Sequence, residues 1–262
     1  MTSSCLFFKN SNNKHVCVYA YYEKSELYKD NLTHFLTKGG ILPNVDYYFV
    51  VNGEYTVSFP VLDNVRVIKR VNKGYDFGAW QSVIKSYIKK RYEFYIFING
   101  SVRGPYIEPE NVWLDKFLEL FNTGPDVKMV GTTINVNDSQ YFSTLFGTFP
   151  CSHIQSMFFI LNEESYTYLY DIGFFDDEES LNNETELIKI VIKKEIAISQ
   201  ILLKHGWNIN CILPKYRDID YRSLSINPNP NIYNGDPCFP GGYFGGTLTP
   251  EEVIFYKSYR FL

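Results

Sequence analysis

The chain has 262 residues, of which 45% are hydrophobic and 21% charged, and its formal net charge is −4. This length is enough to bury a sizeable core in one large domain or two small ones, and the hydrophobic content excludes an intrinsically disordered chain. The slightly acidic balance excludes the extended basic surface that nucleic-acid binding needs, although a few local cations would suffice for a phosphate ligand. We therefore expect a soluble globular protein with no nucleic-acid partner.

Cysteine usage and the N-terminus predict the compartment. The five cysteines are spread along the chain, without the close spacing of a metal knuckle or a redox pair, and unpaired thiols are typical of a reducing compartment. The first residues lack the basic flank and long apolar run of a signal peptide, and no apolar stretch approaches the roughly 20 residues of a membrane-spanning helix. These features predict a cytoplasmic protein without a transmembrane segment.

Short apolar runs alternate with helical patterns along most of the chain. The runs predict strands at residues 16–21, 47–51, 65–71, 95–98, 128–133 and 156–161, and the helical spacing predicts helices at 25–37, 78–90, 111–121 and 194–205. This alternation predicts an α/β fold with a central, mostly parallel sheet flanked by helices. After about residue 213 the chain is rich in Pro, Asn, Gly and Asp, which we interpret as a functional flap or a C-terminal wrap.

The first loop with candidate chemistry follows the strand at 65–71 and reads NKGYDFG from Asn72 to Gly78. In a parallel sheet, ligands bind beyond the carboxyl ends of the strands. Asp76 is therefore placed to accept hydrogen bonds from a ribose or sugar hydroxyl, and the free amides of a helix N-terminus there suit an anion. The alternative is an aspartate that caps the following helix in a Gly-rich turn.

The second loop follows the most apolar strand and contains Asn99 and Ser101. Nucleotide-sugar enzymes place an acidic Asp-x-Asp at such a point, where charged oxygens hold Mn2+ or Mg2+. The equivalents in this sequence are neutral. Metal binding is then weak, or the ligands come from elsewhere, or a cation such as Arg103 replaces the metal. An ordinary turn is the alternative interpretation.

The third loop, CSHIQS, precedes the strand at 156–161 and contains His153 and Gln155. His153 is a candidate contact for an acceptor, a phosphate or a metal, although a single histidine is more often a hydrogen-bonded structural residue.

The helix at 194–205 carries Glu195 near its start, on the same face as Ser199. A carboxylate at the rim of a cleft can remove a proton from an attacking hydroxyl. The alternative is a surface glutamate in a Lys-rich helix.

The last segment carries Lys257 and Arg260, three residues apart, which a helical turn would project to the same side. A pair of fixed cations can neutralise a leaving diphosphate. The alternative is a solvated basic end.

In their order and placement these segments resemble GT-A glycosyltransferases. Glu195, Ser199 and Gly206-Trp207 are similar to the segment ED-x-x-LS-x-R-x-x-x-G, whose second acid is the catalytic base of inverting members, with Lys194 in place of the first acid. The loop at 72–78, FINGSVRGP, HIQS and FYKSYR are similar to the rhamnan-synthesis F-like glycosyltransferases and to related enzymes of large DNA viruses and algae. In that group the fourth-strand tripeptide is often Asn-Asp-Ser, whereas this chain has Asn-Gly-Ser.

The resemblance spans residues 15 to 260 and implies one GT-A (Rossmann-like) domain over residues 1–262. Its nucleotide-sugar-binding half lies at about 15–135, and its acceptor half with the C-terminal flap at about 136–262. The implied activity is transfer of a sugar from a nucleotide diphosphate sugar, with a UDP-sugar favoured, to a hydroxyl of a glycan or protein acceptor. The implied enzyme is of the hexosyltransferase class. The implied cofactor is Mn2+ or Mg2+, although the expected carboxylates are missing.

The resemblance also implies roles for individual residues. Glu195 is the implied catalytic base, and His153 and Gln155 line the acceptor side. The Gly-rich stretch 241–246 is expected to order over the donor. The implied donor-binding residues are Tyr19, Asn72, Asp76, Asn99, Ser101, Arg103, Lys257 and Arg260.

Two other classes of function stay open at this point. The missing acids suit a nucleotide-sugar- or glycan-binding module that has kept the fold without turnover. A nucleotidyltransferase would need a Gly-rich basic loop after the first strand, but the sequence there is YYEKSEL and has no glycine.

Overall fold

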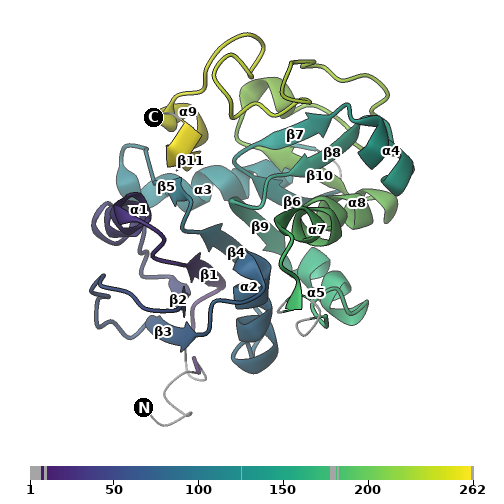
Figure 1. Cartoon of the computed structure of the whole chain (residues 1–262). Coiled ribbons are helices and arrows are strands. Elements are labelled where there is room, and N and C mark those ends of the chain that lie inside the picture. The colour runs from purple at the N-terminus through teal and green to yellow at the C-terminus, as the bar shows by residue number, and fades with distance from the viewer. Residues whose placement is uncertain (1–6, 9–10, 125, 178–180, 182, 261–262) are drawn as a thin grey trace.

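A seven-stranded sheet forms the centre of the molecule in the computed structural model, which describes residues 7–8, 11–124, 126–177, 181 and 183–260 (Figure 1). The strand order is β10-β6-β9-β4-β1-β2-β3. Strand β9 is antiparallel to both of its neighbours, and every other pairing in this sheet is parallel. The strands are β1 (His15–Tyr21), β2 (Val45–Asn52), β3 (Val65–Arg70), β4 (Phe94–Asn99), β6 (Val127–Gly131), β9 (Phe158–Asn162) and β10 (Asn208–Cys211). The predicted α/β class is confirmed.

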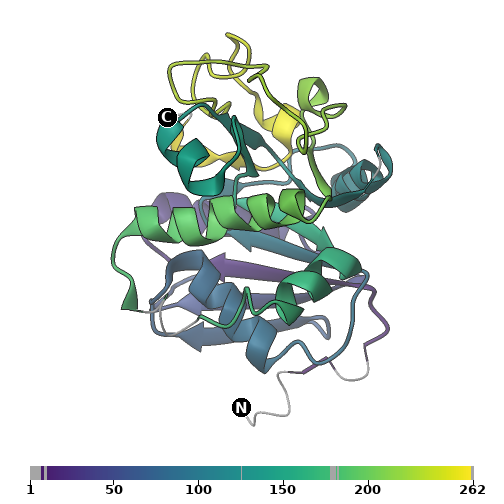
Figure 2. The ribbon, with the colours of Figure 1, turned by 90° about the vertical axis from the view of Figure 1, so that its right-hand side faces the viewer.

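Helices cover both faces of this sheet. Helices α1 and α3 pack on one face, and α2, α5 and α8 pack on the other, where Figure 2 shows them in front of the strands. The α-helices are α1 (Glu26–Thr37), α2 (Tyr75–Ser86), α3 (Trp113–Leu118), α4 (Gln140–Phe146), α5 (Glu163–Asp171), α7 (Leu187–Ile190), α8 (Ala197–Lys204) and α9 (Pro250–Val253). A π-helical segment, η4 (Val191–Ile196), joins α7 to α8, and the 3-10 turns are η2 (Glu110–Val112), η3 (Glu119–Asn122), η5 (Pro214–Tyr216) and η6 (Ser258–Arg260).

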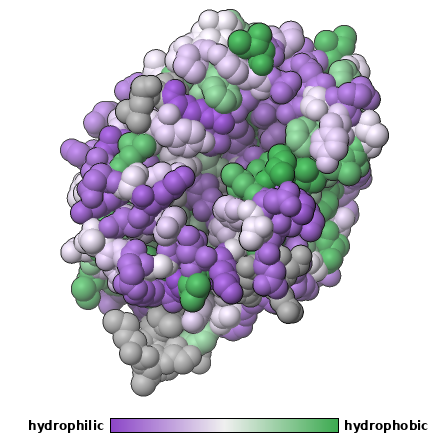
Figure 3. Space-filling view, in the orientation of Figure 1, coloured by the Kyte–Doolittle hydropathy of each residue, from purple (hydrophilic) through white to green (hydrophobic). Residues whose placement is uncertain are grey.

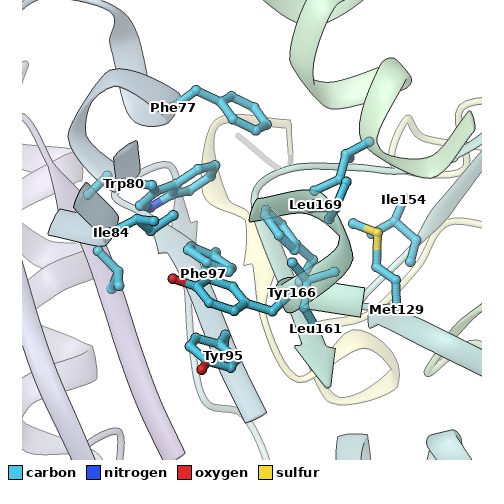
Figure 4. Packing of buried hydrophobic residues seen from close by; sticks show 14 of the residues in the cluster. Phe77, Trp80, Ile84, Tyr95, Phe97, Met129, Ile154, Leu161, Tyr166 and Leu169 are labelled. Carbon is cyan, nitrogen blue, oxygen red and sulfur yellow. The ribbon is translucent and has the colours of Figure 1, made fainter. Parts of the chain in front are cut away.

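The central strands are apolar on both faces because both faces are covered. Every residue of β1 and β2 is buried, as expected of parallel strands between two helical layers. Alternate residues of β1 point to opposite faces. On the α2 face, the Trp80 ring lies 5.6 Å from Phe97 and 5.4 Å from Phe159 between ring centroids, which fixes α2 against β4 and β9 (Figure 4).

Two small sheets lie beyond the central one. Strand β5 (Val102–Arg103) pairs antiparallel with β11 (Tyr256–Lys257), and β7 (Ile134–Asn137) pairs antiparallel with β8 (Cys151–Ile154). The chain between η5 and α9 contains no helix and no strand of these sheets, and Figure 1 shows it looping near β7 and β8. Asn227 fixes it to β7 by donating its side-chain amide to the Val136 carbonyl at 2.9 Å. This stretch, residues 217–249, is the C-terminal wrap.

The boundaries of some elements differ from the predicted ones. The predicted helix at 78–90 begins at Tyr75 and ends at Ser86, and the predicted helix at 194–205 is the end of a longer helical stretch that begins with α7. The four described cysteines are buried and free. In the described part of the chain, no helix has the length and apolar character that crossing a membrane requires.

Candidate functional site

Three polar side chains are joined by hydrogen bonds where β4 ends beside the first turn of α2. Asn99, the last residue of β4, donates its side-chain amide to Asp76 Oδ2 at 2.9 Å. Its Oδ1 accepts the backbone N–H of Ser101 at 3.0 Å and the Ser101 hydroxyl at 2.5 Å. The loop is tied to β1 because the Gly100 N–H donates to the Ala20 carbonyl at 2.9 Å. Two loops that the sequence presents separately therefore form one polar chain, Asp76–Asn99–Ser101.

Asp76 does not cap the helix on which it lies. The N-cap of α2 is Gly74, in the left-handed region with φ of 70°, a conformation that glycine adopts without strain. The helix therefore begins before Asp76, and the Asp76 side chain is free to bond with Asn99 rather than with the backbone. The capping interpretation of Asp76 is wrong.

The environment of Asp76 disfavours its charge. Burial raises the pKa of Asp76 to about 7; the Asn99 hydrogen bond and the charge of Lys257 act against this rise, and the charge of Glu195 adds to it. Asp76, Glu195 and Lys257 are therefore electrostatic neighbours, although they come from three distant parts of the chain. Ionisable groups with raised or lowered pKa values gather at functional sites.

Replacing Asp76 with asparagine is expected to stabilise the protein increasingly as the pH rises from 5 to 7. Folded Asp76 keeps its proton up to about pH 7, whereas an unfolded aspartate loses it near pH 4. The folded wild type thus holds more protons in this interval, so its free energy of unfolding falls as pH rises. Asparagine does not titrate. Urea denaturation at pH 5, 6, 7, 8 and 9 should show a gap that widens to on the order of 1–2 kcal/mol and levels off about one pH unit above the folded pKa. A gap independent of pH would contradict the raised pKa.

The C-terminal segment brings Lys257 to the same edge of the sheet. Strand β11 pairs with β5 directly after the tripeptide, and Lys257 lies opposite Val102. Asn31 of α1 ties the two segments together, because its Nδ2 donates both to the Gly100 carbonyl at 3.1 Å and to Ser258 Oγ at 2.9 Å. The position of Lys257 is therefore fixed by strand pairing and by a buried amide.

The charge of Lys257 is maintained by its neighbours. Burial works against the ammonium, but Tyr259, Glu195 and Cys238 outweigh it, so the pKa of Lys257 is raised. Lys257 in turn acts to lower the pKa values of Asp76 and His153. Lys257 is thus a cation at neutral pH, and its charge acts on Asp76.

The predicted helical turn that carries both Lys257 and Arg260 is wrong. Lys257 lies in β11 and Arg260 in η6. Arg260 Nη1 is 2.5 Å from Asp236 Oδ2, and its guanidinium lies over the Phe239 ring at 3.8 Å. The charge of Arg260 still acts on Lys257, where it opposes the rise of the Lys257 pKa. Arg260 fixes the C-terminal wrap, and its donor contact stays a prediction.

Glu195 lies in the π-helical segment η4, and its carboxylate reaches the turn after β8. The N–H of Ser156 donates to Glu195 Oε2 at 2.9 Å, and the Ser156 hydroxyl makes a short hydrogen bond to the same oxygen. The preceding residue, Lys194, is buried and pairs with Asp177 instead. Ser199 accepts the Ile154 N–H at 3.0 Å, so Glu195 and Ser199 share one face, as predicted. Such π-turns are frequent at functional sites.

His153 lies beside the same carboxylate. Its Nε2 is 3.8 Å from Glu195 Oε1. Burial lowers the pKa of His153 against the opposing charges of Glu195 and Asp236, so the imidazole is neutral at neutral pH. The structure thus brings His153 and Glu195 together.

Gln155 bonds within the protein. Its Oε1 accepts the Thr133 hydroxyl at 2.6 Å and is 3.0 Å from the Cys238 thiol, and only 3% of the residue is exposed. Thr133 directly precedes β7 and Cys238 lies in the C-terminal wrap, so Gln155 joins the two. A contact of Gln155 with an acceptor stays a prediction.

Three expected donor residues make no hydrogen bond with the polar chain in the described part of the structure, although burial and then neighbouring charges, that of Asp76 among them, raise the pKa of the Tyr19 hydroxyl. Arg103 and Lys257 are on opposite faces of the β5–β11 pair, because successive residues of a strand alternate, and Arg103 points toward Asp30 of α1 at 4.0 Å. Tyr19 is in the core, with its ring 5.1 Å from that of Phe35. Asn72 is exposed in the loop before α2. Their donor contacts stay predictions.

The residues at the tripeptide do not fit a divalent cation. Mn2+ and Mg2+ require several oxygen ligands with charge among them. The Oδ1 of Asn99 already accepts two hydrogen bonds from Ser101, and Asp76 is the carboxylate that contacts Asn99. Among the described residues, no three His, Cys, Asp or Glu side chains are grouped to hold a metal.

The face of the molecule that is seen in the orientation of Figure 1 is hollowed in its upper half, and hydrophilic residues lie along the recess (Figure 3). A separate open groove of about 840 Å³ lies at the other end of β4, where it includes Phe94, the first residue of that strand, and Trp207. None of the predicted site residues lines that groove.

Sequence reasoning missed two residues that bind the site together, Ser156 and Asn31. Ser156 is the last residue of the HIQS segment and lies directly before a buried strand. A polar residue in a turn at the end of a strand was the sequence signal for a site residue there. Asn31 lies in the middle of α1 with an exposure of 0%. A polar residue on the apolar face of a helix was its only sequence signal.

Comparisons with known proteins bear on the fold and the family. Residues 52–238 match the family described as Rhamnan synthesis protein F. No curated protein matches the chain significantly.

Three solved structures illustrate the structural similarity. The mannosyltransferase PcManGT from Pyrobaculum calidifontis in complex with GDP-Man and Mn2+ is 10% identical, with a TM-score of 0.48 over 77% of this chain and 55% of that one. The galactosyltransferase LgtC in complex with donor and acceptor sugar analogs is 8% identical, with a TM-score of 0.46 over 92% and 86%. Residues 1–349 of S. aureus TarS are 10% identical, with a TM-score of 0.42 over 70% and 55%. The chain thus spans about half of the mannosyltransferase and of the TarS fragment.

The family match covers more than half of the chain and includes Asp76, Asn99, His153 and Glu195, whereas Lys257 lies outside it. The chain belongs to the rhamnan synthesis protein F family.

Proposed function

We propose that the chain is a GT-A glycosyltransferase of the hexosyltransferase class. It moves a sugar from a nucleotide diphosphate sugar, with a UDP-sugar favoured, to a hydroxyl of a glycan or protein acceptor. The observation that carries the proposal is that two distant segments meet at Asn99: the strand that holds Lys257 pairs with β5 directly after the tripeptide, and the turn at 156–157 joins Glu195 to Asn99. Family membership supports a role in polysaccharide synthesis. The relation to viral and algal enzymes stays a prediction.

In this mechanism Glu195 is the catalytic base. Its Oε1 accepts the proton of the acceptor hydroxyl while the acceptor oxygen attacks the anomeric carbon of the donor. The bond from that carbon to the diphosphate oxygen breaks, and the electron pair stays on the diphosphate, whose added charge Lys257 stabilises. Neutral His153 orients the acceptor beside Glu195, and Asp76 and Asn99 bind hydroxyls of the donor. Attack from the side opposite the leaving group inverts the anomeric configuration.

Lys257 takes the role that a divalent cation has elsewhere. The donor atoms at the tripeptide are poor ligands for Mn2+, whereas the pairing of β11 with β5 places the backbone of Lys257 opposite Val102, directly after the tripeptide. In this proposal residues 15–135 form the donor half of one domain, and residues 136–262 form its acceptor half. The insertion of β9 between β4 and β6 supports a single domain, because it joins both halves in one sheet. The free cysteines support a reducing compartment such as the cytoplasm.

A binding module without turnover is the second candidate. The neutral Asn99 and Ser101, in a position where acids are expected, favour it. Such a module would bind the nucleotide sugar and transfer nothing, so turnover decides between the two.

A thermal-shift screen tests the donor site. We expect UDP or a UDP-sugar to raise the melting temperature, because a ligand that binds the folded state alone stabilises it by mass action. The shift is expected to persist in EDTA, since Lys257 supplies the charge. GDP, dTDP and their sugars are the matched comparisons, each with Mn2+, Mg2+ or EDTA. A shift that EDTA abolishes would assign the charge to a metal, and the absence of any shift in a folded sample would remove the donor site.

A further inference from the structure

The turn between β8 and β9 contacts both sides of the candidate site. Ser156 donates twice to Oε2 of Glu195, through its N–H at 2.9 Å and through its hydroxyl. The carbonyl of the next residue, Met157, accepts the N–H of Asn99 at 3.1 Å. Two consecutive residues thus connect the carboxylate on η4 to the end of β4. The separation between Glu195 and the donor-side tripeptide is set by this turn.

We infer that Ser156 is a positioning residue that orients Glu195 toward the acceptor, an inference that rests on the proposed function. Two donors on one oxygen fix both the position and the plane of the carboxylate. They occupy Oε2 and leave Oε1 directed toward His153, at 3.8 Å. Oε1 is therefore the atom that receives the acceptor proton.

The side-chain contact of Ser156 is specific to this role. A serine that only shapes a turn bonds with a nearby backbone group, whereas the Ser156 hydroxyl bonds across a separation of 39 residues to a carboxylate. Ser156 is half-buried. The hydroxyl and the peptide N–H converge on Glu195 from one residue, so a side-chain change alters one of the two donors and leaves the other in place.

The experiment compares Ser156→Ala with Ser156→Thr, which keeps the hydroxyl, and with Glu195→Gln. We expect Ser156→Ala to lower kcat roughly 10- to 100-fold, because a misplaced catalytic group costs rate rather than binding. The KM for the donor should not change. Ser156→Thr should restore most of the rate.

The outcomes separate this inference from the function on which it rests. Ser156→Ala with wild-type kcat, in an assay where Glu195→Gln is inactive, would overturn the inference alone. The same holds if Ser156→Thr is as impaired as Ser156→Ala. If Ser156→Ala does not fold, Ser156→Cys, which has the same shape with a weaker donor, takes its place and is expected to lower kcat without changing the KM for the donor. A folded wild type that transfers no sugar would overturn the proposed function and this inference with it.

Discussion

Replacing Lys257 with alanine is expected to lower kcat about 100-fold or more, as removal of a fixed group that stabilises developing charge does in other enzymes. Lys257 is placed by β11–β5 pairing and by the Asn31 bridge to Ser258. Neither interaction uses the ammonium, so the fold should survive its loss. Steady-state kinetics with a nucleotide sugar measures the effect, and thermal melting measures the stability, which we expect to change little.

The control for this variant is Lys193→Ala, which removes an exposed lysine next to the buried Lys194. This control should keep wild-type kcat. Lys257→Arg retains a positive charge and is expected to recover part of the rate. Equal turnover in purified Lys257→Ala and wild type would exclude Lys257 from the mechanism.

Replacing Glu195 with glutamine is expected to reduce transfer by about 10³-fold, within the range that general bases contribute. Glutamine has the same shape, and its side-chain oxygen still accepts the two hydrogen bonds from Ser156. It cannot take a proton from the acceptor hydroxyl. Donor binding should persist, because Asp76, Asn99 and Lys257 are unchanged, and a nucleotide-induced shift of the melting temperature checks it.

Glu186→Gln is the matched control, because Glu186 is an exposed glutamate on the same helical stretch. Transfer that survives in Glu195→Gln would show that Glu195 has a structural role or that the reaction retains the anomeric configuration. The configuration of the product, read by NMR, decides between these two explanations.

Most of the fold was predictable because the local pattern of apolar and polar residues indicates which segments are buried. The apolar run at 16–21 became the buried β1, and the run at 95–98 became β4, followed by the polar residues of the site. The loops at Asp76 and Asn99 were found separately from their positions after strands. Their hydrogen bond was not predictable, because it depends on where α2 starts, and the left-handed Gly74 sets that start.

The alternation of strands and helices, and hence the set of loops at the carboxyl ends of the strands, followed from the local residue pattern. The tertiary structure alone decided that β9 enters the sheet reversed, that Lys257 lies in a strand, and that Ser156 holds Glu195. The period of the apolar residues predicts which side chains of a short segment are buried, because the direction of each side chain depends on the local helix or strand geometry. The bridge from Asn31 to Ser258 spans 227 residues, and contacts of that kind form only when distant segments pack side by side.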